Sequence, residues 1–575
     1  MAVKRLCSTV FCTGILFVSA SAQPLGTGVI SGTVVQTESG EAIRKAIVTL
    51  TLDGTPRRWA TTRTDGSGRF QFDGLPAGKY DLRAAKANEG SAIYGAKSVR
   101  ELGDAITLGD GESRSGITLK FLRAASIGGR VLDSDGDPVS DAQVSLLQQG
   151  RNLGAPVPVN YRAANTDDRG EYRFSDVDPG RYYIRVTPSG VRPAMPTKGR
   201  PILVEQYYGG ARDFKDASPV HVSGGDNLVG LDFHIVSEPA VTVRGQVLGV
   251  PEELDPPQTP QASGGSFTSR SRSFIASTSA GGPRGSYVQV MISRAEAGEP
   301  RFSSGTVAQG PEHRFEMPDM PAGRYRFEAS VQSGAKSYGA SEIVDLHPGS
   351  GDIALTLAPG MEIQGALRVE GQAAHGEGPS PGRPGGIQLE LHKPGAFPNN
   401  IVAQIGADGH FSFGQVFPGE WQLTVPLVPH SFLKSARFGD KEVRFATFEI
   451  GANNDAAFNI VVSMRTASVE GEIDAGSSEA PRTGIVVAPV GQYHTFTRFY
   501  YAAQTDAAGK FHLDGIAPGK YKIFALEKTE AESFRNPEAV DQIDELGETI
   551  DLAEGATVQA HPKLIPVDRA LKALQ

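Results

Sequence analysis

One seventeen-residue segment occurs twice in this chain in nearly the same form, more than four hundred residues apart. Thr64–Tyr80 reads TDGSGRFQFDGLPAGKY, and Thr505–Tyr521 reads TDAAGKFHLDGIAPGKY. Three shorter or more divergent versions lie between them, at Thr166–Tyr182, His313–Tyr325 and Ala407–Trp421. A spacing of about one hundred residues is that of whole domains and is too long for solenoid repeats. The chain is therefore predicted to consist of five domains of one kind.

The residues of the segment predict a hairpin. Asp65 with the glycines that follow it is typical of a tight turn, where glycine adopts backbone angles that other residues resist. Phe70 and Phe72 are two residues apart, so on a strand they face the same side, which we expect to be the core. After the Pro76-Ala77-Gly78 turn, Tyr80 and Leu82 return to that core. Because core packing and turns account for these positions, the segment is predicted to be scaffold and not a catalytic signature.

The remainder of each unit also repeats as short alternating strands. Opening strands are predicted at Ser31–Val35, Gly128–Leu132, Arg244–Leu248, Gln364–Arg368 and Glu470–Asp474. Second strands begin near Ala46, Ala142, Tyr287, Ile387 and Ile485. About seven short strands per hundred residues, with 69 glycines and 38 prolines, favour an all-β fold. We predict a tandem array of about five Greek-key (prealbumin-like or Ig-like) β-sandwich domains, elongated because their junctions are short.

The order G-x-V, turn, A-x-V-x-L, T-D-x-x-G-x-F-x-F and P-G-x-Y resembles the carboxypeptidase regulatory-like domain. That family is related to transthyretin-like modules, starch-binding-like sandwiches and collagen-adhesin B-type repeats. The resemblance is strongest in Gly26–Leu122, Ala125–Val236 and Thr466–Pro566, and it is weaker in the two units between them. It implies the fold, whereas such modules serve many functions.

These patterns set the predicted domain boundaries. The expected order is a signal peptide (1–22), β-sandwich domains at 23–123, 124–238, 239–358, 359–464 and 465–566, and a C-terminal tail (567–575). The third domain carries a Pro/Gly/Ser-rich insertion at 251–286 that is predicted to be disordered, and the fourth has a loop insertion at 370–386. The polar stretch Thr529–Glu548 is predicted to form a short surface helix.

The first residues are typical of a cleavable export signal. Lys4 and Arg5 precede the apolar stretch Leu6–Val18, and Ala20-Ser21-Ala22 supplies small residues at the cleavage spacing. Both cysteines, Cys7 and Cys12, lie inside this segment, so the mature chain is expected to have no disulfide or thiol chemistry. Removing the segment changes the formal charge from −9 to −11, which argues against nucleic acid as a partner. We expect a secreted or periplasmic protein without membrane insertion.

Three sequence patterns were considered as a zinc site, a calcium loop and an isopeptide bond, and in each case the residues argue against that chemistry. His313 and Glu316 form an H-x-x-E, but residues three apart on a strand point to opposite faces and cannot share one zinc ion. Asp133–Asp137 has alternating acids like a calcium loop, but its glycine is at the fourth position and no closing Glu follows. The opening strands hold no lysine for an isopeptide bond of the adhesin type. No catalytic residue, cofactor or metal is predicted, and the chain is predicted not to be an enzyme.

Binding is the predicted role, and exposed aromatic rings are its candidate residues. Trp421 takes the position of a core tyrosine, which leaves Trp59 as the tryptophan candidate. The aromatic-rich runs QYY and RFYYAA add Tyr207, Tyr208, Phe499, Tyr500 and Tyr501. Alternate aromatics on a strand usually divide between core and surface, so packing is the favoured explanation of these runs. We expect an exported non-enzymatic binding or spacer protein that mediates protein interaction or adhesion at the cell envelope. The alternatives are a carbohydrate-binding protein of the starch-binding-like kind, with a polysaccharide partner, and an accessory module of a secreted hydrolase.

Overall fold

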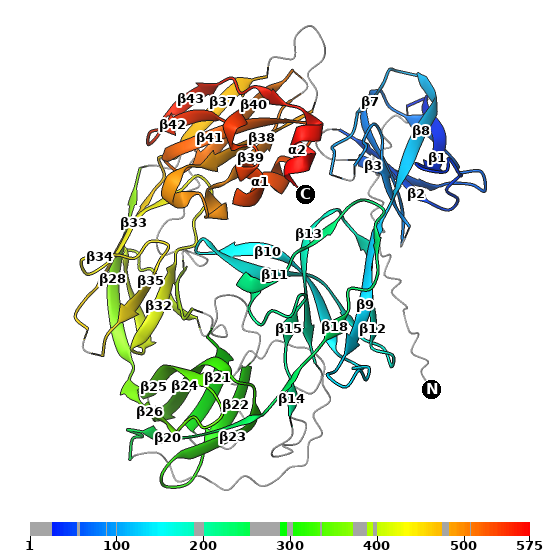
Figure 1. The fold of residues 1–575 in the computed structure, drawn as a ribbon. Helices are drawn as coiled ribbons and strands as arrows, with labels where there is room; N and C mark the ends of the chain where they lie inside the picture. Colours follow the sequence, from blue (N-terminus) through cyan, green and yellow to red (C-terminus); the bar gives the residue numbers. More distant parts are fainter. Residues whose placement is uncertain are drawn as a thin grey trace, which may run out of the picture. The chain divides into compact units, whose positions relative to one another are not determined.

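The computed structural model describes residues 26–53, 58–87, 89–98, 100–188, 201–252, 288–295, 303–333, 336–371, 388–394, 400–452, 454–473, 482–506 and 508–574. The predicted signal peptide and almost all of both predicted insertions lie outside these residues. Two compact units are present: unit 1 is Met1–Val99 with Gly103–Arg123, and unit 2 is Arg100–Leu102 with Ala124–Gln575. Figure 1 shows unit 1 in blue and unit 2 from cyan to red. The five predicted domain boundaries stay a prediction.

Unit 1 contains one sandwich, here called sandwich 1. Its strands are β1 (Gly28–Gln36), β2 (Ile47–Leu52), β3 (Arg58–Arg63), β4 (Arg69–Leu75), β5 (Gly78–Lys86), β6 (Gly90–Ile93), β7 (Ile106–Leu108) and β8 (Ser113–Arg123). The hydrogen-bonded order is β3-β2-β5-β6-β8-β1-β4, and β7 also pairs with β5. The strand β3 is therefore the edge of its sheet.

Unit 2 contains four more sandwiches, numbered in chain order. Sandwich 2 has β9 (Ala125–Leu132), β10 (Gln143–Asn152), β11 (Ala155–Asn165), β12 (Glu171–Val177), β13 (Gly180–Thr187), β14 (Ile202–Leu203), β15 (Gln206–Tyr207), the 3₁₀ turn η1 (Phe214–Asp216), β16 (Val220–Val222), β17 (Asn227–Leu228), β18 (Phe233–His234) and β19 (Ser237–Glu238). Sandwich 3 has β20 (Val241–Leu248), β21 (Val288–Arg294), β22 (Ser303–Ala308), β23 (Arg314–Met320), β24 (Gly323–Ser333), β25 (Lys336–Leu346), β26 (Ile353–Thr356) and β27 (Ala358–Pro359).

The last two sandwiches complete unit 2. Sandwich 4 has β28 (Met361–Glu370), β29 (Gln388–His392), β30 (Ile401–Gln404), β31 (His410–Val416), β32 (Gly419–Thr424), β33 (Phe432–Phe438), β34 (Lys441–Glu442), β35 (Thr447–Ile450) and β36 (Phe458–Ser463). Sandwich 5 has β37 (Ala467–Glu472), β38 (Thr483–Pro489), η2 (Gly491–Tyr493), η3 (Thr497–Phe499), β39 (Tyr501–Gln504), β40 (Lys510–Ile516), β41 (Gly519–Glu527), η4 (Ala531–Phe534), α1 (Pro537–Asp541), η5 (Asp544–Leu546), β42 (Glu548–Leu552), β43 (Thr557–Ala560), β44 (Leu564–Ile565) and α2 (Val567–Ala573).

One pairing scheme recurs in all five sandwiches. The opening strand pairs antiparallel with the motif strand and parallel with a closing strand, as β28 does with β31 and β36. The second strand lies between the next two strands of the facing sheet, as β29 does between β30 and β32. The predicted all-β tandem array of sandwiches is confirmed.

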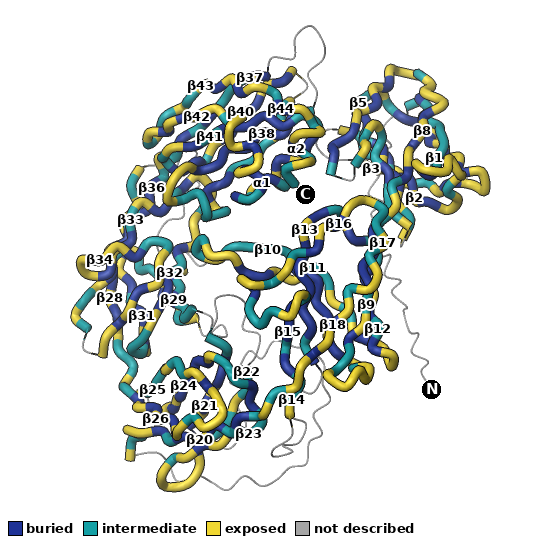
Figure 2. Tube along the Cα trace, viewed as in Figure 1, coloured by how far each residue is buried: buried dark blue, intermediate teal, exposed yellow. Residues whose placement is uncertain are grey.

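The repeated segment is scaffold in the structure. Phe70, Phe72, Leu75, Tyr80 and Leu82 are all buried in the core of sandwich 1. Figure 2 shows the same alternation of buried and exposed residues along the strands of the other sandwiches. The prediction that these side chains face the core is confirmed.

The closing tyrosine of the segment has a fixed hydrogen bond. The hydroxyl of Tyr80 donates to the carbonyl of Pro76 at 2.6 Å, and Tyr521 donates to Ala517 at 2.7 Å. In sandwich 4 the indole Nε1 of Trp421 donates to the carbonyl of Phe417 at 2.8 Å. Each bond runs four residues back, so the tryptophan replaces the tyrosine without losing the contact.

Two sandwiches carry an additional apolar layer outside their second sheet. In sandwich 5, α1, α2 and η4 cover the outer face of β38 and β41, and every residue of β38 is buried. In sandwich 2 a smaller cluster of Leu147, Tyr183, Tyr207 and Phe214 covers part of the same face. The helix predicted within Thr529–Glu548 is present as α1, but Ala539 and Val540 on it are buried, so it is part of a core.

Candidate functional site

The predicted aromatic pair of sandwich 2 belongs to its outer layer. Tyr207 is fully buried, and its ring lies 5.9 Å from the ring of Phe214. Tyr208 is half-buried, with its ring 5.9 Å from that of Phe233. Tyr207 is therefore closed to a ligand, because packing occupies its ring.

The predicted aromatic run of sandwich 5 is divided between two cores. Tyr500 is fully buried, and its hydroxyl donates to the carbonyl of His494 at 2.7 Å. The half-buried Tyr501 accepts a hydrogen bond from the amide of Ala517 at 2.9 Å. Phe499 is 9 % exposed and packs 4.7 Å from the ring of Tyr493. These three rings pack against other residues of the protein and do not form a continuous exposed surface on which a sugar could stack.

Trp59 is placed differently from the other candidates. Its side chain is 72 % exposed on the edge strand β3. It lies opposite Thr51 on β2, and the register continues to Asp81 on β5. We call the outer side of β3, β2 and β5 the Trp59 face.

The Trp59 face is polar, basic and partly apolar. Thr61 and Arg63 follow Trp59 on the same side of β3, and both are exposed. Ile47 is 47 % exposed on β2, and Arg83 is exposed on β5. Whereas sandwiches 2 and 5 cover this side with apolar layers, sandwich 1 leaves a tryptophan and an isoleucine there in contact with solvent.

The edge itself also differs from the equivalent edges. The edge strand β11 of sandwich 2 contains Pro156 and Pro158, which cannot donate backbone hydrogen bonds. The equivalent strand β22 contains Gly305, and β30 has only four residues. The sequence of β3, RWATTR, contains neither proline nor glycine and is rich in residues that favour strands. It is therefore suited to pairing with another strand.

A second candidate site is a hollow within unit 2, of about 190 Å³. We call it the three-sandwich hollow because sandwiches 2, 4 and 5 all line it. Its lining residues are Arg151, Asn152, Leu153, Gly154, His392, Gln422, Leu423, Thr424, Phe445, Ala446, Phe496, Thr497 and Arg498.

Side-chain contacts hold these three sandwiches around the hollow. Gln149 and Arg151 at the end of β10 donate to the carboxylate of Glu538 on α1. Lys434 of sandwich 4 contacts Glu554 of sandwich 5 at 2.9 Å and Glu370 at 2.7 Å. These hydrogen bonds lower the pKa of both carboxyls and raise that of Lys434.

The two patterns considered for metals have structural explanations. His313 precedes β23 with φ of +46°, at the position where the other copies of the segment have glycine. It is thus in the turn and not on the strand as predicted. Asp133 uses its carboxylate to accept the backbone amides of Asp135 and Asp137, both at 2.9 Å. Within the described ranges no group of three or more His, Cys, Asp or Glu is placed to hold a metal ion.

Sequence reasoning did not find the three-sandwich hollow. Phe445, Phe496 and Arg498 come from two sandwiches and have no common motif, so only their tertiary placement unites them. A signal was present in the run QYHTFTRFYY, whose aromatic content exceeds what its own sandwich core uses.

Comparisons with known proteins agree with the resemblance. The model of the carboxypeptidase regulatory-like domain matches residues 29–112 and 126–202. These ranges fall in sandwiches 1 and 2, so the predicted resemblance is confirmed there. A 174-residue stretch is 28% identical to Colossin-A of Dictyostelium discoideum. This match covers 28% of the present chain and 2% of the length of Colossin-A.

Solved structures with similarity to the chain include pilins and repeat units of a collagen-binding protein. The streptococcal ancillary pilin matches with a TM-score of 0.21 and 9% identity, over 57% of this chain and 98% of that one. The shaft pilin SpaA from Lactobacillus rhamnosus GG matches with a TM-score of 0.21 and 10% identity, over 37% of this chain and 97% of that one. Two B repeat units of the collagen-binding protein of Staphylococcus aureus match with a TM-score of 0.12 and 11% identity, over 76% of this chain and 99% of that one.

Proposed function

We propose that this chain, two segments of which match the carboxypeptidase regulatory-like domain, is an exported, non-enzymatic binding protein. Its sandwiches provide a framework, and the Trp59 face of sandwich 1 binds a protein partner. The partner contributes an extended segment with acidic side chains, which adds to the edge of β3. This role places the protein in the periplasm or outside the cell.

The 72 % exposure of Trp59 is the observation that supports the proposal most. A tryptophan exposed to this extent buries a large area when a partner covers it, and such residues are enriched among the strongest contributors to protein interfaces. Because its strand is a sheet edge, the same partner also gains backbone hydrogen bonds. The exposed guanidinium groups of Arg63 and Arg83 favour acidic side chains on the added segment.

Export is supported by the amino-terminal sequence. The basic, apolar and small-residue segments of residues 1–22 are those of a cleavable signal. In the part of the chain that the structure describes, no helix is both long enough and apolar enough to span a bilayer.

A polysaccharide is the second candidate partner, and one observation favours it. The exposed ring of Trp59 has Thr51 opposite it and Thr61 two residues further along β3. An aromatic platform with adjacent hydroxyl groups suits the apolar face of a sugar ring. A single exposed ring offers less stacking area than a protein interface with an added strand, so we place this candidate second.

The test places a photo-crosslinking amino acid at position 61 of the full-length secreted protein. The crosslinker at Thr61 is expected to capture one defined protein, which is then purified and titrated against the unlabelled chain. Trp59→Ala should weaken this binary complex at least tenfold, and Trp59→Phe should keep most of the affinity. The same crosslinker at Gln71, exposed on β4 of the facing sheet, is the control and should not capture that protein.

Affinity electrophoresis through gels that contain polysaccharides separates the two candidates. If a polysaccharide slows the migration of the unmodified protein and Trp59→Ala abolishes that effect, the ligand of the Trp59 face is a glycan and not a protein. A purified protein partner whose binding is unaffected by Trp59→Ala would show that the Trp59 face is not the binding surface.

A further inference from the structure

We propose that the three-sandwich hollow binds a small aromatic carboxylate. The inference is independent of the Trp59 face, because none of the hollow's lining residues lies in sandwich 1. It follows from the charges, hydrogen-bond donors, rings and size of the hollow.

The charged groups that line the hollow are positive. Arg151 and Arg498 supply two guanidinium groups, and none of the lining residues is an aspartate or glutamate. The Nη2 of Arg151 is paired with Glu538, which lies outside the lining. Arg498 has no ion pair or hydrogen bond within the described ranges. The hollow therefore has an excess of positive charge that an anion would neutralise.

The two guanidinium groups differ in their availability to a ligand. The Nε of Arg151 is buried and has no hydrogen-bond partner among the described residues. Because this nitrogen has almost no accessible surface, a ligand in the hollow does not reach it, and Arg498 is the guanidinium group that an anion would contact. Partial burial lowers the pKa of Arg498 through desolvation, yet a guanidinium group keeps its charge in proteins. Carboxylate oxygens are suited to the guanidinium group of Arg498.

Aromatic rings form the apolar part of the lining. The rings of Phe445 and Phe496 have centroids 6.0 Å apart and are tilted by 54°. The guanidinium carbon of Arg498 lies 4.9 Å from the centroid of Phe445. A flat ring bound in the hollow packs against the exposed edges of these phenylalanines, and its carboxylate then faces Arg498. This arrangement favours an aromatic acid over a simple inorganic anion.

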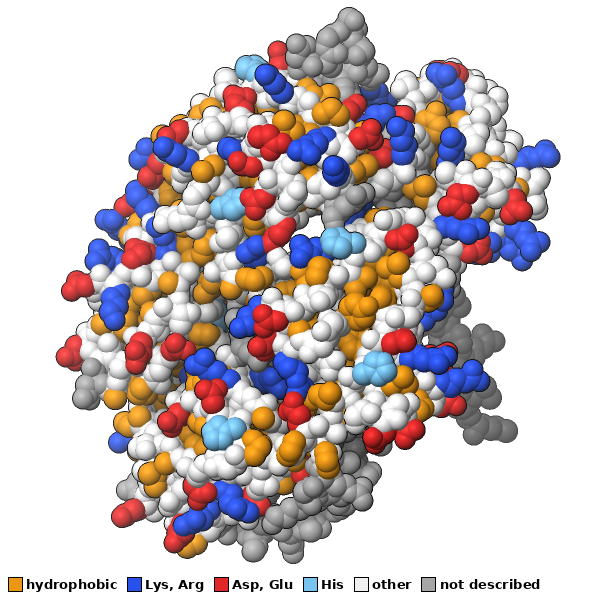
Figure 3. Space-filling model, viewed as in Figure 1, with side chains coloured by type: hydrophobic (Ala, Val, Ile, Leu, Met, Phe, Trp, Pro, Cys, Tyr) orange, Lys and Arg blue, Asp and Glu red, His pale blue; other side chains and the backbone are white. Residues whose placement is uncertain are grey.

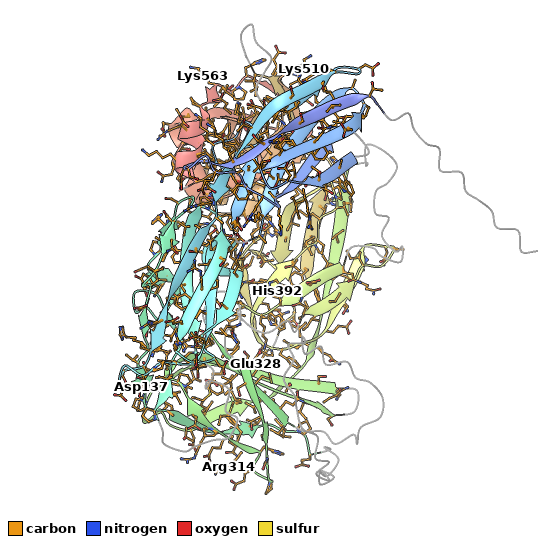
Figure 4. The ribbon with its side chains drawn as sticks, turned by 90° about the vertical axis from the view of Figure 1, so that its right-hand side faces the viewer. Asp137, Arg314, Glu328, His392, Lys510 and Lys563 are labelled. Atoms are coloured by element: carbon orange, nitrogen blue, oxygen red, sulfur yellow. The ribbon has the colours of Figure 1, made fainter. Side chains whose placement is uncertain are left out.

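The polar wall of sandwich 4 is already ordered by its own hydrogen bonds. His392 contacts the Oε1 of Gln422 at 3.0 Å, and Gln422 donates to Thr447 at 3.1 Å. The next residue, Lys393, donates from its Nζ to the Oε1 of Glu328 at 2.8 Å. Figure 4 labels both His392 and Glu328. With its walls preformed, the hollow loses little conformational freedom on binding.

The size of the hollow limits the ligand. A volume of 190 Å³ corresponds to about six water molecules at liquid density. This is enough for a single ring with one carboxylate. Benzoate is therefore the probe that we expect to bind, and benzamide is its neutral counterpart of the same shape.

The experiment titrates benzoate, benzamide and acetate into the full-length mature protein by isothermal calorimetry. Benzoate is expected to bind at least tenfold more tightly than benzamide, because the amide cannot neutralise Arg498. Acetate should also bind more weakly than benzoate, because it makes no contact with the phenylalanine rings. Arg498→Gln should lower benzoate affinity at least tenfold, and Arg498→Lys should restore part of it.

Two further variants keep the test specific. Arg437→Gln removes an exposed arginine of sandwich 4 that does not line the hollow, and it should leave benzoate affinity unchanged. Phe445→Leu should weaken benzoate more than acetate. The proposal is overturned if benzoate does not bind, if benzamide binds equally well, or if Arg498→Gln retains full affinity with an unchanged melting temperature. Should Arg498→Gln fail to fold, Phe445→Leu and Arg498→Lys carry the same test.

Discussion

Gly365 lies directly opposite Phe411 across the β28–β31 pair, and a Cβ atom on Gly365 would come within 2.3 Å of the ring's Cζ. The same relationship joins Gly32 to Phe70 at 2.9 Å and Gly245 to Phe315 at 2.4 Å. In these three sandwiches the glycine of the opening strand thus leaves room for the first aromatic ring of the repeated segment. Two sequence features that are about forty to seventy residues apart are in fact one packing contact.

We expect Gly365→Ala to destabilise sandwich 4 by about 1–3 kcal/mol, because the added methyl group forces the ring of Phe411 out of its position. Urea unfolding followed by tryptophan fluorescence measures the change. Gly414→Ala, on the motif strand of the same sandwich, is the control, because a Cβ there meets no atom within 4 Å. Equal unfolding midpoints for the two variants would contradict the packing explanation.

His313→Gly is expected to stabilise sandwich 3 by about 0.5–1 kcal/mol. The φ of +46° at His313 is costly for a residue with a Cβ, and glycine adopts it freely. Gly68, Gly170, Gly409 and Gly509 occupy the equivalent turns with φ between +71° and +83°. The unfolding midpoint in urea is the measurement. Glu312→Gly, at an adjacent exposed position outside that backbone region, should not stabilise the protein.

Stability is expected to fall when the pH rises above about 10, the ordinary pKa of tyrosine. Burial raises the pKa of Tyr172, Tyr182, Tyr500 and Tyr521 above that value in the folded protein. Below pH 10 these hydroxyls are protonated in both states, so their contribution is complete. At higher pH the unfolded chain loses these protons first, and the free energy of unfolding decreases.

Urea unfolding between pH 8 and about 11 measures this dependence. Tyr521→Phe should cost about 1 kcal/mol at neutral pH, because its hydrogen bond to Ala517 is lost. The same variant should have a shallower decline with pH than the unmodified chain, since one titrating group is gone. An identical slope would show that Tyr521 does not contribute.

The two tryptophans are expected to differ in their access to a quencher. Trp59 is 72 % exposed and Trp421 is 2 % exposed, so acrylamide should quench one component of the emission strongly and the other weakly. Trp59→Phe should remove the strongly quenched component, and Trp421→Tyr should leave it alone. A single class of emission in the unmodified chain would contradict the placement of Trp59.

The sequence was sufficient to predict the fold because the repeated segment combines turn residues with alternating core residues. Phe70, Phe72 and Tyr80 face the core as their spacing requires. The opening strands were predicted within a few residues of β1, β9, β20, β28 and β37. Such features are local, so a single segment contains the information that specifies them.

The candidate site depended on information that is not local. An alternating run does not reveal whether the outer face of a sheet is covered. Packing was therefore expected within both aromatic runs, but the sequence did not show that Tyr207 and Tyr500 are the residues it buries. Their burial depends on η1, which begins seven residues after Tyr207, and on the helical segments after β41, which begin about thirty residues after Tyr500. Figure 3 shows acidic and basic side chains interspersed on the visible face, so charge gave no further indication of a site.

The order in which the chain is synthesised gives the last helix a particular importance. Ala570 of α2 is fully buried against the outer face of sandwich 5, next to Phe534 and Ile565. Because β38 begins at Thr483 and α2 ends at Ala573, about ninety residues must be synthesised from the start of this face before the layer can close. Until then the apolar side of β38 and β41 is open to chaperones or to other nascent chains. A fragment that stops at residue 566, the end of the predicted fifth domain, would remain in that incomplete state and aggregate.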